Sequence, residues 1–109
     1  MLDPQEQRHL RGHLDQIDYA AFAANREVIG KALGAVDMAK FQRMAICAAH
    51  ARAEWVAAAL AISEHTHAPS QDEVAQLNTL RSAYDELAEA YEAMRRMVER
   101  GYLSFSANK

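Results

Sequence analysis

Residues 38–64 read MAKFQRMAICAAHARAEWVAAALAISE, and this stretch decides the fold. It holds ten alanines, the only cysteine and the only tryptophan of the chain. Between Met44 and Ile62 the clearly polar side chains are His50, Arg52 and Glu54. Alanine is the best helix former, and a helix that is apolar on nearly every side is usually buried on more than one side. We therefore expect a central helix on which the rest of the chain packs.

The central helix is predicted to span residues 38–64. Asp37 precedes it as an N-cap, and Pro69 disfavours helical backbone at Ala68, so that 65–69 becomes a short loop. Its best apolar stripe contains Phe41, Met44, Ala48, Trp55 and Ile62, flanked by Ala45, Ala51 and Ala58.

An earlier helix is predicted over residues 4–33. Asp3 can cap it, Pro4 suits the first helical position, and Glu6 completes a capping box. Asn25 interrupts the apolar stripe, and a break of the helix there is an alternative to one continuous helix. Gly34 is expected to end the helix in the left-handed conformation. The stripe contains Leu10, Leu14, Ile17, Ala21, Val28 and Ala32.

A third helix is predicted over residues 71–100. Ser70 and Glu73 form a capping box, and Gly101 ends the helix. Apolar residues follow alternately three and four apart, which is coiled-coil seam spacing. The tail 102–106 alternates apolar and polar residues and is predicted to be a short extended piece packed on another part of the protein. The seam contains Leu77, Leu80, Tyr84, Leu87, Tyr91, Met94 and Val98.

Three long helices joined by short loops predict an all-α fold, an up-down-up antiparallel three-helix bundle. Half of the 109 residues are hydrophobic and a quarter are charged, as in globular chains. The length corresponds to one domain, residues 1–109.

The central helix has too few polar residues to give a solvent-facing side, so we expect a homodimer or a complex with another protein. Large exposed apolar patches mark interfaces, and alanines let a second backbone approach closely. The alternative is that solvent-facing alanines only favour the helix. The residues predicted at the dimer or partner interface are Phe41, Met44, Ala48, Ala51, Trp55, Ala58, Ile62, Tyr102, Leu103 and Phe105.

Four of the five histidines are predicted at one pole of the bundle. His9 and His13 are four residues apart, which places both rings on one helix face, a common arrangement of metal ligands. His65 and His67 lie in the loop expected at the same pole. These histidines could bind zinc or nickel or respond to pH; the alternative is that all four are solvated surface residues.

Cys47-Ala48-Ala49-His50 resembles the redox end of the alkylhydroperoxidase-D type of all-α proteins. In that family a second cysteine precedes the pair, and here Met44 stands three residues before Cys47. The resemblance covers four residues and does not imply dithiol chemistry. We expect Cys47 to be a buried, unreactive side chain among alanines.

Composition argues against several classes of function. The net charge is −3 and there is no basic stripe, so nucleic acid is not expected as a direct partner. The longest uncharged run of the central segment, 55–63, is far shorter than a membrane span, and no membrane association is expected. One cysteine cannot form an internal disulfide, which suits the cytoplasm. No residue set indicates an enzyme or a cofactor.

The sequence therefore predicts a small cytoplasmic, non-catalytic interaction module, such as a regulator, an adaptor or a chaperone. It would act as a helical homodimer that binds a partner protein. The alternative is a metal- or pH-responsive sensor that uses the histidine cluster.

Overall fold

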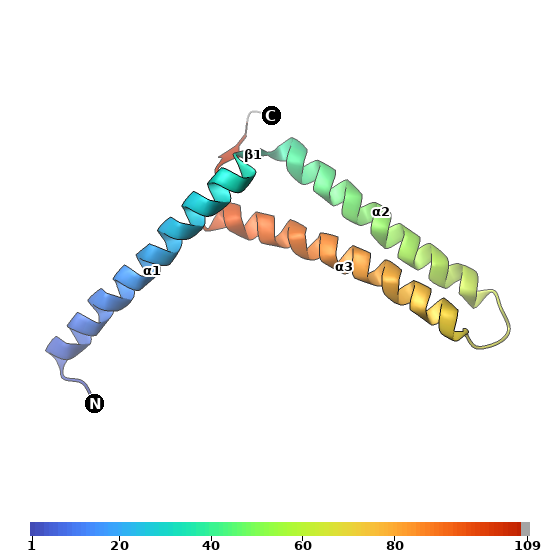
Figure 1. Cartoon of the computed structure of the whole chain (residues 1–109), viewed down its shortest axis with the longest axis horizontal. Coiled ribbons are helices and arrows are strands. Elements are labelled where there is room, and N and C mark those ends of the chain that lie inside the picture. Colours follow the sequence, from blue (N-terminus) through green and yellow to red (C-terminus); the bar gives the residue numbers. More distant parts are fainter. Residues whose placement is uncertain (108–109) are drawn as a thin grey trace. The chain divides into compact units, whose positions relative to one another are not determined.

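The computed structural model describes residues 1–107, which contain three long helices and two very short strands (Figure 1). Helix α1 spans Pro4–Leu33, α2 spans Met38–Ser63 and α3 spans Gln71–Glu99. Strands β1 (Val36–Asp37) and β2 (Phe105–Ser106) pair with each other. The all-α prediction is confirmed, and each helix ends within one residue of its predicted boundary.

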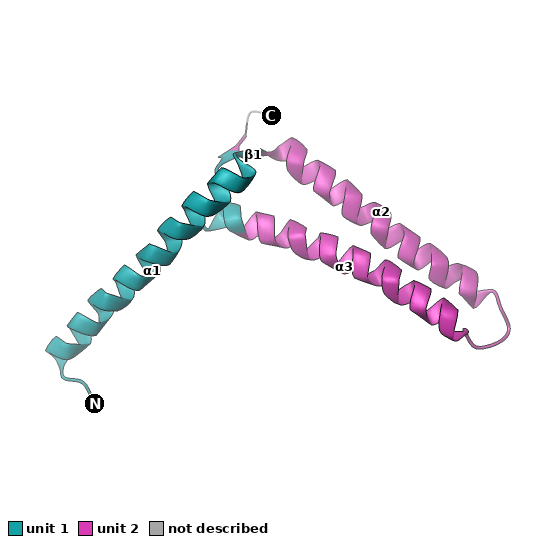
Figure 2. Ribbon diagram, viewed as in Figure 1, with its two compact units in different colours: residues 1–36, 97–105 teal, residues 37–96, 106–109 magenta. Residues whose placement is uncertain are grey.

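The chain divides into two compact units (Figure 2). The first consists of Met1–Val36 and Met97–Phe105, and it contains α1 together with the end of α3 and the tail. The second contains α2 and most of α3, within Asp37–Arg96. The three-helix bundle and the single domain stay predictions.

Helices α2 and α3 form an antiparallel hairpin (Figure 1). The ring of Phe41 meets the edge of Tyr91, with centroids 5.7 Å apart. The ring of Trp55 stacks on Tyr84 at 6.0 Å. Because the later residue of α2 pairs with the earlier residue of α3, the helices run in opposite directions. The contact therefore follows the stripe of α2 and the seam of α3 that the sequence shows.

The predicted caps explain why the helices begin where they do. The Asp3 carboxylate accepts a hydrogen bond from the Glu6 amide, and the Glu6 carboxylate accepts one from the Asp3 amide. Asp37 accepts from the amide of Lys40 at 3.0 Å. Since these carboxylates satisfy amides that lack helical partners, the chain enters each helix at the cap. Helix α1 is continuous past Asn25, whose side chain donates to the carbonyl of Ala21.

Two glycines with positive φ turn the chain within the first unit. Gly101, at φ 79°, follows α3 in a Schellman motif: its amide donates to the carbonyl of Val98, and the Tyr102 amide donates to that of Met97. Gly34 has φ 66° and ψ −167°, so its φ is positive as predicted but its ψ is extended. That region is essentially restricted to glycine.

The first unit contains both buried residues of residues 1–107, Val36 and Leu103, each 3% exposed. The Val36 amide donates to the carbonyl of Ser104 at 2.9 Å, which holds the tail alongside the chain that follows α1. Of the tail predicted to be extended, residues 102–106, a strand forms at Phe105–Ser106 (β2), whereas Tyr102 and Leu103 lie in the bend that follows α3.

No residue of α1, α2 or α3 is buried. The expectation that the central helix is buried on more than one side is therefore wrong within this chain. In its compact unit only α3 lies against α2, and two helices cover only the stripe along which they meet.

Candidate protein-binding groove

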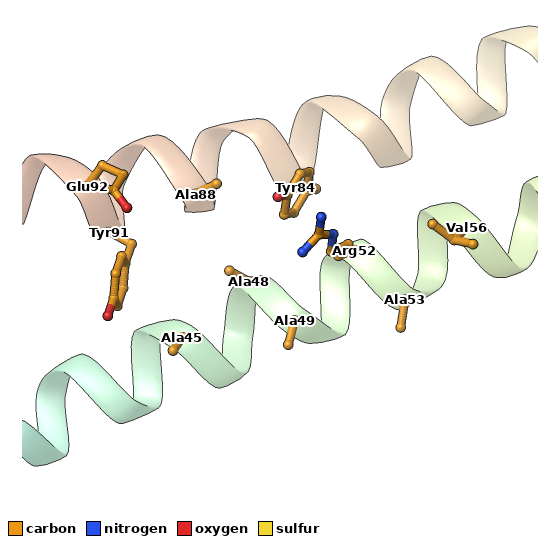
Figure 3. A pocket seen from close by; sticks show the side chains of 10 residues that line it. All are labelled: Ala45, Ala48, Ala49, Arg52, Ala53, Val56, Tyr84, Ala88, Tyr91 and Glu92. Atoms are coloured by element: carbon orange, nitrogen blue, oxygen red, sulfur yellow. The ribbon is translucent and has the colours of Figure 1, made fainter.

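An open groove of about 640 Å³ runs along the α2–α3 hairpin (Figure 3). The α2 side consists mainly of alanines, and the α3 side carries two tyrosines. The lining residues are Ala45, Ala48, Ala49, Arg52, Ala53, Val56, Tyr84, Ala88, Tyr91 and Glu92. Because the alanine side chains are only methyl groups, another helix could pack close to the backbone of α2.

Cation–π contacts hold the aromatic side of the hairpin in place. The guanidinium of Arg52 lies over the ring of Tyr84, 5.4 Å from its centroid. Arg81 lies over the ring of Trp55 at 5.8 Å. Such contacts contribute about 0.5–1 kcal/mol each at exposed sites. They fix the tyrosine ring that forms one wall of the groove, while the Arg52 charge stays on its surface.

The predicted interface stripe of α2 lies on the side that faces α3. Phe41 and Trp55 contact α3 through their rings. All seven residues of the stripe are half-buried, whereas Ala49, Ala53 and Val56 are exposed. The stripe is thus the seam of the hairpin, and contact of its residues with a second chain stays a prediction. The seven residues are Phe41, Met44, Ala48, Ala51, Trp55, Ala58 and Ile62.

The predicted interface residues of the tail lie within the first unit. The Tyr102 ring packs on Phe22, with centroids 5.8 Å apart. Leu103 is buried, while Phe105 remains 40% exposed in β2. Tyr102 and Leu103 thus lie against the protein's own chain, and contact of Phe105 with a partner stays a prediction.

Sequence periodicity did not identify the side of α2 that lines the groove. It identifies the stripe that meets α3 but does not show that α3 leaves the neighbouring flank open. The available signal was the four-residue spacing of Ala45, Ala49 and Ala53, which places three small residues on one helix face.

The four predicted metal ligands lie in different units. His9 and His13 are exposed on α1, and His65 and His67 lie after α2. The rings of His65 and His67 stack with centroids 5.0 Å apart. In residues 1–107 no group of three or more His, Cys, Asp or Glu side chains is placed to hold a metal ion. The four-histidine site stays a prediction.

One histidine contact joins the loop to the start of α3. The Nδ1 atom of His65 lies 3.4 Å from Oε2 of Glu73. The Glu73 carboxylate also accepts a hydrogen bond from the Ser70 amide at 2.8 Å, and the Ser70 hydroxyl accepts one from the Glu73 amide. The hydrogen bond from the Ser70 amide lowers the pKa of Glu73 below its ordinary 4.5, and the nearby His65 lowers it further by a smaller amount. The predicted capping box is confirmed.

Cys47 is exposed, so the expectation that it is buried is wrong. It lies on α2 outside the half-buried seam, and its unit has no other helix to cover that side.

Helix α2 is long and apolar enough to cross a membrane. It has 26 residues, with a mean hydropathy of 1.3 over the most apolar part, and none of that part is buried. Central helices of soluble proteins pass the same test of length and composition. In residues 1–107 it is the one helix that does so.

In comparisons with known proteins, the chain matches no family model, no curated protein and no solved structure.

Proposed function

We propose that this protein is a small, non-catalytic interaction module that forms a homodimer and holds a helix of a partner protein in the α2–α3 groove. The single observation that supports it best is the alanine-lined groove beside the half-buried stripe along which α2 meets α3. Helix-in-groove recognition lays the apolar face of an amphipathic helix against such a surface.

The shape and lining of the groove favour a helix over a small molecule. The α2 residues from Ala45 to Val56 span roughly 17 Å along the helix axis. Ligand pockets usually enclose their ligand and aim several polar groups at it. Here the ionic groups are one arginine and one glutamate, and the groove is open along the hairpin.

Charge defines the partner helix further. Arg52 and Glu92 lie on different helices of the groove, and Ala48 and Ala88 lie between them (Figure 3). A partner helix with an acidic residue toward Arg52, small apolar residues in the middle and a basic residue toward Glu92 complements this surface. Opposite charges of this kind set orientation and specificity more than affinity.

The remaining parts of the proposal rest on composition. A cytoplasmic location is supported by the lone cysteine, and the absence of a recognisable catalytic residue pattern in the sequence favours binding over catalysis. The apolar surface left on the helices favours association with protein.

A photo-crosslinking amino acid at Ala49 in the full chain, expressed in its host, tests the proposal. We expect cross-links to one helical segment of another protein, located by mass spectrometry. A synthetic peptide of that segment should bind the purified protein, and Ala49→Glu or Ala53→Glu should weaken binding at least about tenfold. The matched control is the same probe at Ala57, an exposed α2 alanine outside the groove lining.

Three outcomes would overturn the proposed groove function. One is equal capture from positions 49 and 57. Another is cross-linking only to a second copy of this chain. The third is a peptide whose binding both glutamate variants leave unchanged.

A further inference from the structure

Helix α1 has two apolar faces, and the first unit uses only one of them. Phe22 packs on Tyr102, and the Arg26 guanidinium donates a hydrogen bond to the carbonyl of Gly101. Ile29 and Gly30 on the same side are half-buried. This face holds the tail.

The opposite face of α1 is open along most of its length. Leu10 is 45% exposed, Leu14 49%, Ile17 62% and Val28 64%. With Ala21 and Ala24 they are spaced alternately four and three residues apart, which is the seam spacing of a two-stranded coiled coil. At 100° per residue, this seam lies on the side of the helix away from Phe22 and Arg26. It therefore remains available after the tail has packed.

The charges that border the seam match those of a second copy. In a parallel, in-register coiled coil, a residue on one border lies near the partner residue five positions later on the other border. This rule pairs Glu6 with the partner's Arg11, and His13 with the partner's Asp18. The next two pairs are Ala20 with the partner's Asn25 and Glu27 with the partner's Ala32, so no like charges meet.

We propose that α1 forms the dimer interface, as a parallel coiled coil with α1 of a second copy from about Gln7 to Val28. The antiparallel pairing with Ile17 opposite the partner's Ala21 would bring the two Asp18 carboxylates together, which is unfavourable. Lys31 would continue the seam as a charged layer and forms an ion pair with Glu27, 3.7 Å apart. The coiled coil therefore ends before it.

This inference rests on the dimer of the proposed function and names its surface. It leaves the α2–α3 groove for the partner helix, because the two surfaces share no residue. An experiment can therefore refute the α1 dimer interface without refuting partner binding in the α2–α3 groove, and the reverse.

Disulfide trapping in the full chain tests the interface. In a Cys47→Ser background, Leu14→Cys places one thiol in the seam and Tyr19→Cys places one at a side chain that is 70% exposed away from the seam. Facing seam positions of a parallel coiled coil approach the Cα separation that a disulfide needs, about 5.5–6 Å. In glutathione redox buffer we expect Leu14→Cys to form covalent dimers at least about ten times more readily than Tyr19→Cys, with helical content unchanged.

A charge-matched pair provides the second readout. Arg11→Glu would face the partner's Glu6 and is expected to raise the dimer dissociation constant about tenfold. Arg8→Glu makes the same change in net charge outside the seam borders and should change it by less than about threefold. Dimers that neither cross-link through Leu14→Cys nor distinguish Arg11→Glu from Arg8→Glu would overturn this interface while keeping the dimer. A chain that stays monomeric would overturn both.

Discussion

The two compact units bury apolar surface in different ways. The first closes a small cluster, in which Val36 and Leu103 are 3% exposed, by turning the chain at two glycines. The second joins α2 to most of α3 along an aromatic seam but buries none of their residues. Turns and a tail can enclose a side chain from several directions, whereas two straight helices cover each other on one side only. The difference separates residues that hold the chain together from apolar residues that stay exposed.

The largest expected effect falls on the buried cluster. Leu103→Ala removes a buried side chain and leaves a cavity, and should lower the free energy of unfolding by about 2–4 kcal/mol. Urea unfolding followed by circular dichroism measures it. Phe105→Ala, at a 40% exposed position two residues later, is the matched control and should cost less than about 1.5 kcal/mol. Equal losses of unfolding free energy in Leu103→Ala and Phe105→Ala would contradict the difference drawn between buried and exposed residues.

A smaller effect is expected in the seam of the hairpin. Tyr84→Ala removes the ring that stacks on Trp55 and supports Arg52, and should cost about 1–3 kcal/mol because the site is half-buried. The emission of Trp55 should shift to longer wavelength. Val56→Ala, on the open flank, should cost under about 1 kcal/mol and leave the emission unchanged. An unchanged spectrum in Tyr84→Ala would mean that the seam does not form as described.

The bond between Arg26 and the Gly101 carbonyl sharpens the comparison within the first unit. Arg26→Ala should cost about 1–2 kcal/mol, because the carbonyl at the turn loses a charged donor. Hydrogen exchange of the Val36 amide should become faster, since that amide bonds to Ser104 in the tail. Unaltered exchange would show that the tail is held without Arg26.

The smallest expected effect concerns the start of α3 and depends on pH. The pKa of Glu73 is lowered in the folded protein, so its charged form adds stability above its ordinary pKa of 4.5. That stability is lost as the pH falls through the lowered value. Glu73→Gln keeps an acceptor for the Ser70 amide without a titrating charge. The free energy of unfolding of the wild type minus that of Glu73→Gln should therefore shrink as the pH is lowered from about 6 to about 3. A difference that is constant over this range would refute the role of the charge.

The helices were predictable because their ends are specified by local chemistry. Asp3, Asp37 and Ser70 satisfy exposed amides within a few residues, so no knowledge of distant contacts was needed. Apolar spacing also identified the stripe of α2, which the sequence assigned to a dimer or partner interface and which in the structure meets α3. Alternation predicted the extended backbone at Phe105–Ser106, but not the bend at Tyr102 and Leu103.

The candidate groove was harder to predict, because it exists only where α3 leaves one side of α2 exposed. The four-residue spacing of Ala45, Ala49 and Ala53 places them on one helix face, but an alanine reads the same in a sequence whether a neighbour packs on it or not, so the spacing does not show that the face is open. A backbone hydrogen bond joins Val36 to Ser104, which lies 68 residues later, and nothing in the sequence near Val36 specifies that contact. The alanine neighbours of Cys47 predict a buried thiol, but they do not show whether another helix covers that side, and Cys47 is exposed.

Sedimentation equilibrium of the full chain tests the central claim most directly, because an interaction module with open apolar faces on α1 and α2 should associate. We expect a mass of twice 12.2 kDa at micromolar concentration. Leu14→Asp should return it to one chain mass with its helical content retained in the α2–α3 hairpin. A wild-type chain that stays at 12.2 kDa across the accessible concentrations would contradict the account.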